Sequence, residues 1–371
     1  MDYYFKTEQM SVGYQGKPLI EQIEIGLNKG EILTIIGPNG AGKSTILKSI
    51  ARQLKLLEGV LYLDMKEIAR MPGDELSRKM AVVFTQKLRT ELMTCEDVVA
   101  TGRYPYTGYF GILSKEDNAR VQEAMELVHV TEIRDRDFTK ISDGQRQRVM
   151  LARAIAQEPE IIILDEPTSF LDVKYKLEFL SLLQELRSKK GLTVIMSIHE
   201  LELAQRVSDR ILCIGDNRVE RFGTAEEIFQ PGYLNRLFKI DEGSFDETNG
   251  NLELKPPSGK ADIFVIAGAG SGRNIYRRLQ REGKAFITGI ISENDLDFPV
   301  AGALAAEVIC TRAFEPVENA VLEKAKRAMD SCSRVICTRK EFGSLESANK
   351  ELYEYARRSG KMTENGQEGL G

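Results

Sequence analysis

The stretch Gly37-Pro38-Asn39-Gly40-Ala41-Gly42-Lys43-Ser44 decides how the rest of this sequence is interpreted. It matches the pattern GxxxxGK[ST], in which a glycine-rich turn joins a strand to a helix. Small residues let the backbone wrap around phosphates with its N–H groups pointing inward, and the helix N-terminus adds partial positive charge. Lys43 would reach the β- and γ-phosphates of a nucleotide, and the Ser44 hydroxyl would bind Mg²⁺. The context fits, because residues 31–36 predict a buried strand and residues 43–53 predict a helix.

A second apolar strand is predicted to end in two acids. Residues 161–164 are all apolar, and Asp165 and Glu166 follow them directly. At the carboxyl end of a parallel strand, Asp165 would hold Mg²⁺ and Glu166 would polarise the attacking water. Alone, this pattern is better explained by a strand capped by solvated acids. Together with the phosphate loop, it predicts an ATP site.

Between these two pieces, the sequence Ile141-Ser142-Asp143-Gly144-Gln145 resembles the signature motif of the ABC ATPases, usually Leu-Ser-Gly-Gly-Gln. Asp143 departs from the family pattern, and we expect an acid near ATP to weaken binding or to alter its dependence on Mg²⁺. The resemblance covers residues 3–255. It implies that Ser142 and Gly144 of a second chain complete each ATP site, so a homodimer is expected.

The resemblance also implies roles for residues outside the three motifs. Tyr14 would stack on adenine, Gln86 would sense Mg²⁺ and the transport partner, Asp172 would belong to the D-loop, and His199 would contact the γ-phosphate. The candidate catalytic residues are Glu166, His199, Gln86 and Asp172, and the candidate metal ligands are Ser44, Gln86 and Asp165. The expected cofactors are ATP and Mg²⁺. The candidate nucleotide-binding residues are Tyr14, Gly37, Pro38, Asn39, Gly40, Ala41, Gly42, Lys43, Ser44, Thr45, Ser142, Gly144 and Gln145.

Composition excludes several other classes of protein. The 371 residues are 42% apolar with a net charge of −5, which argues against disorder and against a chain whose main task is gripping nucleic acid. No apolar run reaches the roughly 18 residues needed to span a bilayer, and the N-terminal residues do not form a secretory signal. Five cysteines without a CxxC pair and two histidines predict neither a disulfide framework nor a His-built metal site.

Among ABC proteins, a single phosphate loop and the absence of membrane helices leave the ATPase subunits of importers. Residues 93–108 and 113–117 resemble those of iron-siderophore, heme and cobalamin importers, where this region lies near the permease. Arg103 and the tyrosines beside it, in an exposed loop, would suit a partner interface. We therefore expect an ATPase on the cytoplasmic face of the membrane that powers import of a metal chelate. Its partners would be a second copy, a separate permease and, indirectly, an extracytoplasmic substrate-binding protein, with no nucleic acid.

Two alternatives stay open from the sequence. The chain could be a non-transport regulatory ABC ATPase whose C-terminal domain senses a metabolite. It could also be a fused enzyme that acts on the imported cargo, although the second domain contains no histidine and no visible Ser/His/Asp set.

The expected fold is α/β, with an ABC-type ATPase domain that includes antiparallel and helical subdomains, followed by a small Rossmann-like domain. Turn residues in 241–260 predict a hairpin and a linker, which places the domains at 1–257 and 258–371. Strands are expected near 263–267, 285–291, 307–310 and 334–337, with helices between them.

Two patterns in the second domain have no assigned role. The glycine run Gly268-Ala-Gly270-Ser-Gly272-Arg273 predicts either a phosphate- or anion-binding turn, with Glu293 and Asp295 near a ribose, or simply a tight turn. The sequence Val-Ile-Cys-Thr-Arg occurs at residues 308–312 and again at 335–339. This repeat predicts either two buried strand cysteines or an anion pocket or thiol sensor built from Cys310, Arg312, Cys337 and Arg339.

Overall fold

The computed structural model describes residues 3–84, 92–108, 111–169 and 171–363. The chain divides into two compact units, Met1–Phe238 and Lys239–Gly371.

The first unit is built on a six-stranded sheet with the order β11-β10-β4-β9-β8-β7. All neighbouring strands run parallel except β11, which pairs antiparallel with β10. Because β4, β8 and β9 are parallel neighbours, their carboxyl ends meet at one edge. The strands of this sheet are β4 (Ile32–Ile36), β7 (Met80–Val83), β8 (Ile161–Asp165), β9 (Thr193–Ser197), β10 (Arg210–Gly215) and β11 (Arg218–Gly223).

A second, antiparallel sheet belongs to the same unit and includes the N-terminal strands. Its order is β2-β1-β5-β6, with β3 paired to β1. It confirms the antiparallel subdomain expected in the ATPase domain. Its strands are β1 (Phe5–Tyr14), β2 (Lys17–Ile23), β3 (Gly26–Leu27), β5 (Glu58–Leu63) and β6 (Lys66–Glu67).

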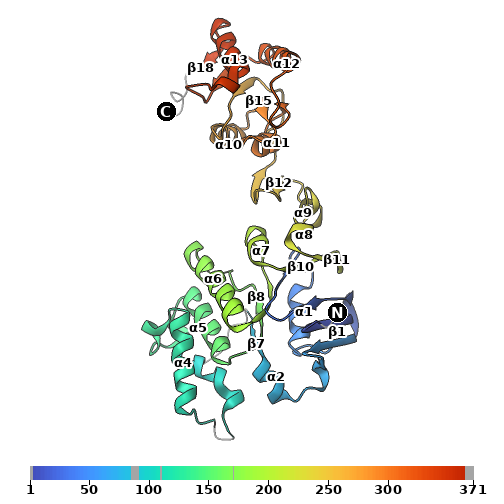
Figure 1. Ribbon diagram of the computed structural model, residues 1–371, viewed down its shortest axis with the longest axis vertical. Helices are drawn as coiled ribbons and strands as arrows, with labels where there is room; N and C mark the ends of the chain where they lie inside the picture. Colours follow the sequence, from blue (N-terminus) through green and yellow to red (C-terminus); the bar gives the residue numbers. More distant parts are fainter. Residues whose placement is uncertain (1–2, 85–91, 109–110, 170, 364–371) are drawn as a thin grey trace. The chain divides into compact units, whose positions relative to one another are not determined.

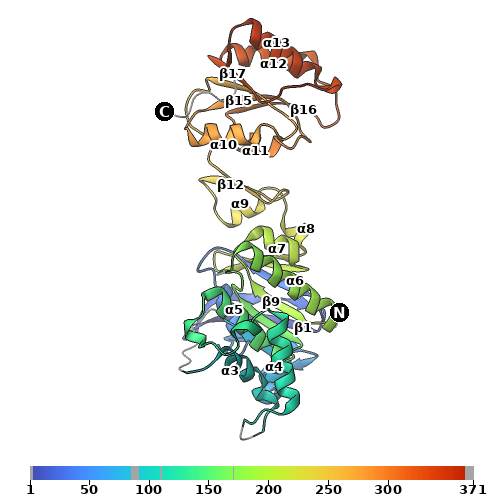
Figure 2. The same ribbon diagram turned by 90° about the vertical axis from the view of Figure 1, so that its left-hand side faces the viewer.

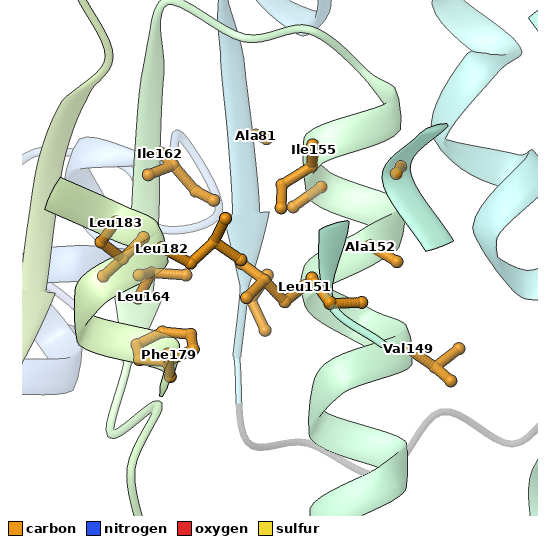
Figure 3. Close-up of a cluster of buried hydrophobic side chains, with 14 of the residues drawn as sticks. Ala81, Val149, Leu151, Ala152, Ile155, Ile162, Leu164, Phe179, Leu182 and Leu183 are labelled. Atoms are coloured by element: carbon orange, nitrogen blue, oxygen red, sulfur yellow. The ribbon is translucent and has the colours of Figure 1, made fainter. Parts of the chain in front are cut away.

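Helices cover one face of the six-stranded sheet, and α1 with the antiparallel sheet covers the other (Figure 1). Alternate residues of β8 point to the two faces, as a strand requires. Ile162 and Leu164 join the core beneath α5 and α6, whereas Ile161 and Ile163 join the core beneath α1. Figure 3 shows Ile162 and Leu164 among side chains of α5 and α6. The helices are α1 (Lys43–Ile50), α2 (Gly73–Lys79), α3 (Cys95–Ala100), α4 (Lys115–Leu127), α5 (Asp143–Ala156), α6 (Val173–Lys190), α7 (Leu201–Val207), α8 (Ala225–Ile228) and α9 (Tyr233–Leu237).

The second unit contains a parallel sheet with the order β16-β15-β14-β17-β18. Figure 2 shows α10 and α11 on one face of this sheet and α12 and α13 on the other. The expected Rossmann-like layers are confirmed, with the two-residue strand β18 as an addition that its length hides from pattern reading. The elements are β14 (Ile263–Ile266), β15 (Phe286–Ser292), β16 (Glu307–Thr311), β17 (Arg334–Cys337), β18 (Met362–Thr363), α10 (Arg273–Arg281), α11 (Phe298–Leu304), α12 (Asn319–Asp330) and α13 (Ser347–Arg358).

The division between the units falls before the position expected from the sequence. The predicted hairpin is present as β12 (Gly243–Asp246) and β13 (Asn251–Leu254), but its contacts are with α11. Glu253, buried on β13, also forms an ion pair with Arg277 of α10. These contacts group the hairpin with the second unit, rather than with the ATPase domain to which residues 1–257 were assigned.

Among the described residues, no helix is long and apolar enough to cross a membrane.

Candidate functional site

Three glycines shape the loop between β4 and α1. Gly37, Gly40 and Gly42 have φ angles of 152°, 79° and 101°, a region that side chains other than glycine rarely adopt. A Cβ atom on Gly37 would lie 2.2 Å from the carbonyl oxygen of Ile214. Gly42 caps α1 without a side-chain hydrogen bond, so the positive end of the helix dipole faces the loop without a side chain in front of it. This local structure suits an anion.

Lys43, the first residue of α1, is folded back over the loop. The residue is 5% exposed, and its Nζ donates hydrogen bonds to the carbonyl oxygens of Gly37 (2.8 Å) and Pro38 (3.0 Å). Burial lowers the pKa of Lys43, and the carboxylates of Glu166 and Asp165 oppose that shift. Phosphate oxygens would form stronger, charge-assisted bonds with this ammonium than the two carbonyls do.

Asp165, the last residue of β8, meets α1 at the same edge of the sheet. Its Oδ1 accepts hydrogen bonds from Ser44 Oγ (3.1 Å) and Ser197 Oγ (2.7 Å). A serine hydroxyl beside a carboxylate offers the hard oxygen ligands that Mg²⁺ prefers, so this donor set fits the expected magnesium ion. Gln86, the third predicted ligand, lies outside the described residues.

Glu166 and His199 are the two candidate catalytic side chains at this edge of the sheet. His199 Nε2 is hydrogen-bonded to Glu166 Oε1, and both side chains are about one third exposed, at 35% and 32%. Glu166 has a φ of 50°, a conformation that strains a non-glycine residue and often occurs at functional sites. Its backbone N–H donates to Ser197 Oγ (3.0 Å), and its Oε2 accepts from Ser169 Oγ (3.3 Å). An acid and an imidazole in contact beside a phosphate loop can orient and polarise a water molecule.

Tyr14 stands beside the helix that follows the loop. Its hydroxyl is hydrogen-bonded to Thr45 Oγ1 at 3.1 Å, and 49% of the residue is exposed. An exposed ring at this position can accept a stacked base. Asn39 lies exposed at the tip of the loop, and the N–H of buried Ala41 donates to the Pro38 carbonyl at 3.2 Å.

The residues of the signature segment make local contacts at the start of α5. Ser142 is the N-cap of α5 and forms a capping box with Gln145. Asp143 is paired with Arg146 one turn later, so its charge has a partner within the same helix. Asp172 has a similar role in α6, where its Oδ1 accepts a hydrogen bond from the N–H of Tyr175 (3.0 Å).

The structure therefore separates the predicted residues into two groups. Ser44, Asp165, Glu166 and His199 are linked at one sheet edge by hydrogen bonds, either directly or through Ser197. Lys43 lies close enough for the carboxylates of Glu166 and Asp165 to act on its pKa. Ser142, with Gln145, caps α5 and Asp172 caps α6, and their capping hydrogen bonds stay within those helix starts. Each chain thus presents one assembled phosphate-and-metal site and a separate helix start.

One expectation for the helical part was wrong, because Arg103 is not exposed. The residue is 4% exposed. Its Nε donates to Asp117 (2.9 Å), its Nη1 donates to the Ala156 carbonyl (2.7 Å), and its guanidinium lies 4.0 Å from the Tyr106 ring. Tyr104, by contrast, is 60% exposed. Of this pair, only Tyr104 is available to a partner.

The glycine turn of the second unit is already occupied by carboxylates of the same chain. Asp297, which is fully buried, accepts hydrogen bonds from the N–H groups of Gly272 (2.8 Å) and Arg273 (3.2 Å) at the start of α10. Asp295 accepts from the N–H of Ala269 (2.8 Å). These acids use the donors that a phosphate would need, so the geometry favours the tight-turn interpretation over an anion site.

The repeated cysteine and arginine pattern is also divided. Cys310 lies within β16, one residue before its end, and Cys337 is the last residue of β17; β15 and β14 lie between these two strands. Three strand spacings of about 4.8 Å separate the two positions. Burial raises the pKa of Cys337, and Arg339 is paired with Glu346. The structure gives no support to a shared pocket or thiol sensor built from the repeat.

Ser197 is the site residue that sequence reasoning missed. It lies opposite Asp165 in the parallel register of β8 and β9 and bonds both Asp165 and the N–H of Glu166. The available signal was a hydroxyl at the end of a buried strand, two residues before His199. Its use depends on which strands are neighbours, which the motifs alone do not specify.

Comparison with known families gives two matches. The family described as "ABC transporter" matches residues 20–169, which contain the phosphate loop, the signature segment and Asp165. The family described as "MJ0874 family" matches residues 286–363, within the second unit.

Three relatives illustrate the range of similarity. An uncharacterized ABC transporter ATP-binding protein, MJ0873 of Methanocaldococcus jannaschii, is 42% identical over 285 residues, covering 76% of this chain and 98% of that protein. The iron(3+)-hydroxamate import ATP-binding protein FhuC of Bacillus subtilis is 38% identical, covering 63% and 87%. The cobalamin import ATP-binding protein BtuD of Halobacterium salinarum is 29% identical over 335 residues, covering 88% and 83%.

Solved structures agree with these relatives. A metal-chelate type ABC transporter in an inward-facing conformation has a TM-score of 0.57 and 28% identity, covering 64% of this chain and 90% of that chain. A dimeric, post-hydrolysis ATP-binding cassette, MJ0796 with ADP and Pi, has a TM-score of 0.54 and 29% identity, covering 60% and 98%. With the assembled phosphate loop and its acidic partners, these similarities show that the chain belongs to the ABC transporter ATP-binding proteins.

Proposed function

We propose that this chain is the ATP-hydrolysing subunit of an importer and powers uptake of a metal chelate through a separate permease. The observation that carries the proposal is the convergence of Lys43, Ser44, Asp165, Glu166 and His199 at one sheet edge. The site lies at the carboxyl ends of β4, β8 and β9, where open α/β sheets bind their ligands. The relatives named as siderophore and cobalamin import ATP-binding proteins support the transport role.

The residues divide the chemistry of hydrolysis among them. The backbone of the loop and Lys43 would hold the phosphates, and Ser44 and Asp165 would hold Mg²⁺, which offsets the charge of the phosphates. Glu166 would polarise the attacking water, and His199, which is hydrogen-bonded to Glu166, would contact the γ-phosphate. Tyr14 would stack on the adenine. Gln86 and Asp172 keep the roles that the family resemblance implies.

A second copy of the chain would complete each site. In one chain, Ser142, Gly144 and Gln145 lie at the start of α5, apart from the phosphate loop. The related cassettes that crystallised as dimers support an ATP-bridged homodimer. This dimer would sit on the cytoplasmic face of the membrane against the permease, with a substrate-binding protein on the other side.

Among the candidate cargoes, we favour cobalamin. The match to the Halobacterium cobalamin import protein covers 88% of this chain, more than the first unit of Met1–Phe238 can supply. That protein therefore shares part of the second unit. The match to the hydroxamate import protein covers 63% and fits within the first unit.

Uptake in cells that carry the Glu166→Gln chain would test the proposal. Labelled cobalamin, heme and ferric siderophore would be compared with uptake in cells that carry the unaltered chain. Loss of cobalamin uptake alone is the expected result. Loss of siderophore or heme uptake would support the importer proposal but contradict the assignment of cobalamin as the cargo. Unchanged uptake of all three would contradict the importer and favour a regulatory ATPase.

A further inference from the structure

The turn between Glu166 and the D-loop forms hydrogen bonds with two other parts of the chain. Gln147, on α5, donates from Nε2 to the carbonyl oxygen of Pro167 (2.6 Å). Thr168, which is 1% exposed, donates from its Oγ1 to Glu200 Oε2 (2.9 Å). Glu200 follows His199 directly in the chain. The turn that leaves the reactive acid is thus tied to the segment that carries the reactive histidine.

Glu200 also reaches the helix that begins beyond the D-loop. Its second oxygen, Oε1, accepts a hydrogen bond from Lys176 of α6 (2.5 Å). Burial alone would raise the pKa of Glu200, but the bonds from Lys176 and Thr168 outweigh it and leave the pKa below its ordinary value. The side chain is about one third exposed. One carboxylate therefore joins three segments: the turn after Glu166, the start of α7 and the first turns of α6.

The geometry differs from that of an ordinary helix-capping acid. Glu200 is the N-cap residue of α7, yet its side chain makes no capping hydrogen bond. Both carboxylate oxygens are directed to other elements instead. The next acid, Glu202, shows the ordinary surface arrangement, since it pairs with Arg206 within α7 and 52% of its side chain is exposed.

We infer that Glu200 is a positioning residue for ATP hydrolysis. By holding Thr168, it fixes the backbone that follows Glu166 relative to His199. By holding Lys176, it makes the position of the D-loop depend on the position of His199. This inference rests on the proposed ATPase function and adds a residue that acts through others, because Glu200 does not contact the phosphate loop in the structure.

The first test compares steady-state ATP hydrolysis by full-length variants. Glu200→Ala should lower kcat about 10- to 100-fold, because small displacements of reacting groups cost that much. KM for ATP should stay within about twofold, because the phosphate loop is untouched. Thr168→Val, which replaces the hydroxyl by a methyl group, should lower kcat in the same way. Thr168→Ser, which keeps the hydroxyl, should have the kcat of the unaltered chain. Glu202→Gln is the matched control and should leave both constants unchanged.

Two outcomes would overturn the inference. One is a kcat for Glu200→Ala equal to that of Glu202→Gln. The other is a rise in KM that accounts for the whole loss, which would indicate damage to binding. The double variant Glu200→Ala/Thr168→Val should lose no more activity than the worse single variant, whereas fully multiplicative losses would show that the two residues act independently.

A second measurement separates this inference from the ATPase proposal. If the unaltered chain hydrolyses no ATP, the proposed function fails. Hydrogen exchange still tests whether Glu200 holds the turn that follows Glu166. In Glu200→Ala, the amides of residues 168–169 should exchange faster than in Glu202→Gln, with the protection of β8 unchanged. Equal exchange at residues 168–169 in the two variants would overturn the inference in that case.

Discussion

Replacing Arg103 by alanine should destabilise the ATPase unit and spare the reacting groups. The Arg103 side chain is 5% exposed and the side chain of its partner Asp117 is 9% exposed. Removing the guanidinium would leave Asp117 Oδ1 and the Ala156 carbonyl without a donor in a buried place. Breaking a buried pair from one side costs about 3–5 kcal/mol.

The lower end of that range applies here, about 3 kcal/mol, because Asp117 keeps part of its support. Its Oδ2 still accepts hydrogen bonds from Ser114 Oγ (2.6 Å) and from the N–H of Ser114 (2.9 Å). These bonds, followed by the Arg103 guanidinium, hold the pKa of Asp117 below its ordinary value. The stability that Asp117 contributes is therefore complete above about pH 4 and is lost as the pH falls through its folded-state pKa. The difference in the free energy of unfolding between Arg103→Ala and the unaltered chain should therefore become smaller at acidic pH.

Calorimetry of the full chain at neutral pH would measure the effect. For a unit of this size, 3 kcal/mol lowers Tm by about 6–12 °C. Arg120→Ala is the matched control, because its ion pairs with Glu123 and Glu158 are more exposed and worth less than about 1 kcal/mol. A Tm for Arg103→Ala equal to that of Arg120→Ala would refute the buried-pair reasoning. It would restore the expectation that Arg103 serves a partner.

The other predictions concern the sites themselves. Glu166→Gln should bind ATP, lose hydrolysis by at least about 100-fold and accumulate as a dimer with ATP in gel filtration; retained turnover would contradict the role of Glu166. Gly37→Ala should lower the free energy of unfolding by about 2 kcal/mol more than Gly73→Ala does, because only the Gly37 Cβ would meet a carbonyl. Its midpoint in urea should therefore be lower, and equal midpoints for the two variants would contradict this. Asp297→Ala should destabilise the second unit by about 2–3 kcal/mol in urea titrations, and inorganic phosphate should recover part of that loss by binding the N–H groups of Gly272 and Arg273; a second unit as stable as in the unaltered chain would contradict the role of Asp297.

Sequence motifs identify residues whose chemistry is local. The phosphate loop needs glycine at fixed spacing, and an acid after an apolar strand marks a sheet edge, so Lys43, Ser44, Asp165 and Glu166 could be named before the structure was known. The elements of the second unit could be predicted as well, because buried parallel strands form short apolar runs.

Residues that depend on neighbouring elements could not be identified in this way. Ser197 acts because β9 lies beside β8, and Arg103 is buried because α4 and α5 close over it. The glycine turn of the second unit was ambiguous for the same reason. Its donors meet Asp295 and Asp297 only after β15 and α11 have packed beside it.

The separation of the two groups of site residues gives a physical reason for the proposed dimer. The phosphate loop offers the N-terminus of α1, with backbone donors and Lys43, to one side of a nucleotide. The start of α5 is a second helix N-terminus, where Ser142 is exposed and its Oγ accepts only a long 3.3 Å bond from the N–H of Gln145. Asp143 would weaken this positive end, but its pairing with Arg146 offsets the charge. In the proposed dimer, the two helix N-termini would face one triphosphate, repel each other without it and be held together by it, so binding of ATP would close the dimer and loss of the γ-phosphate would release it.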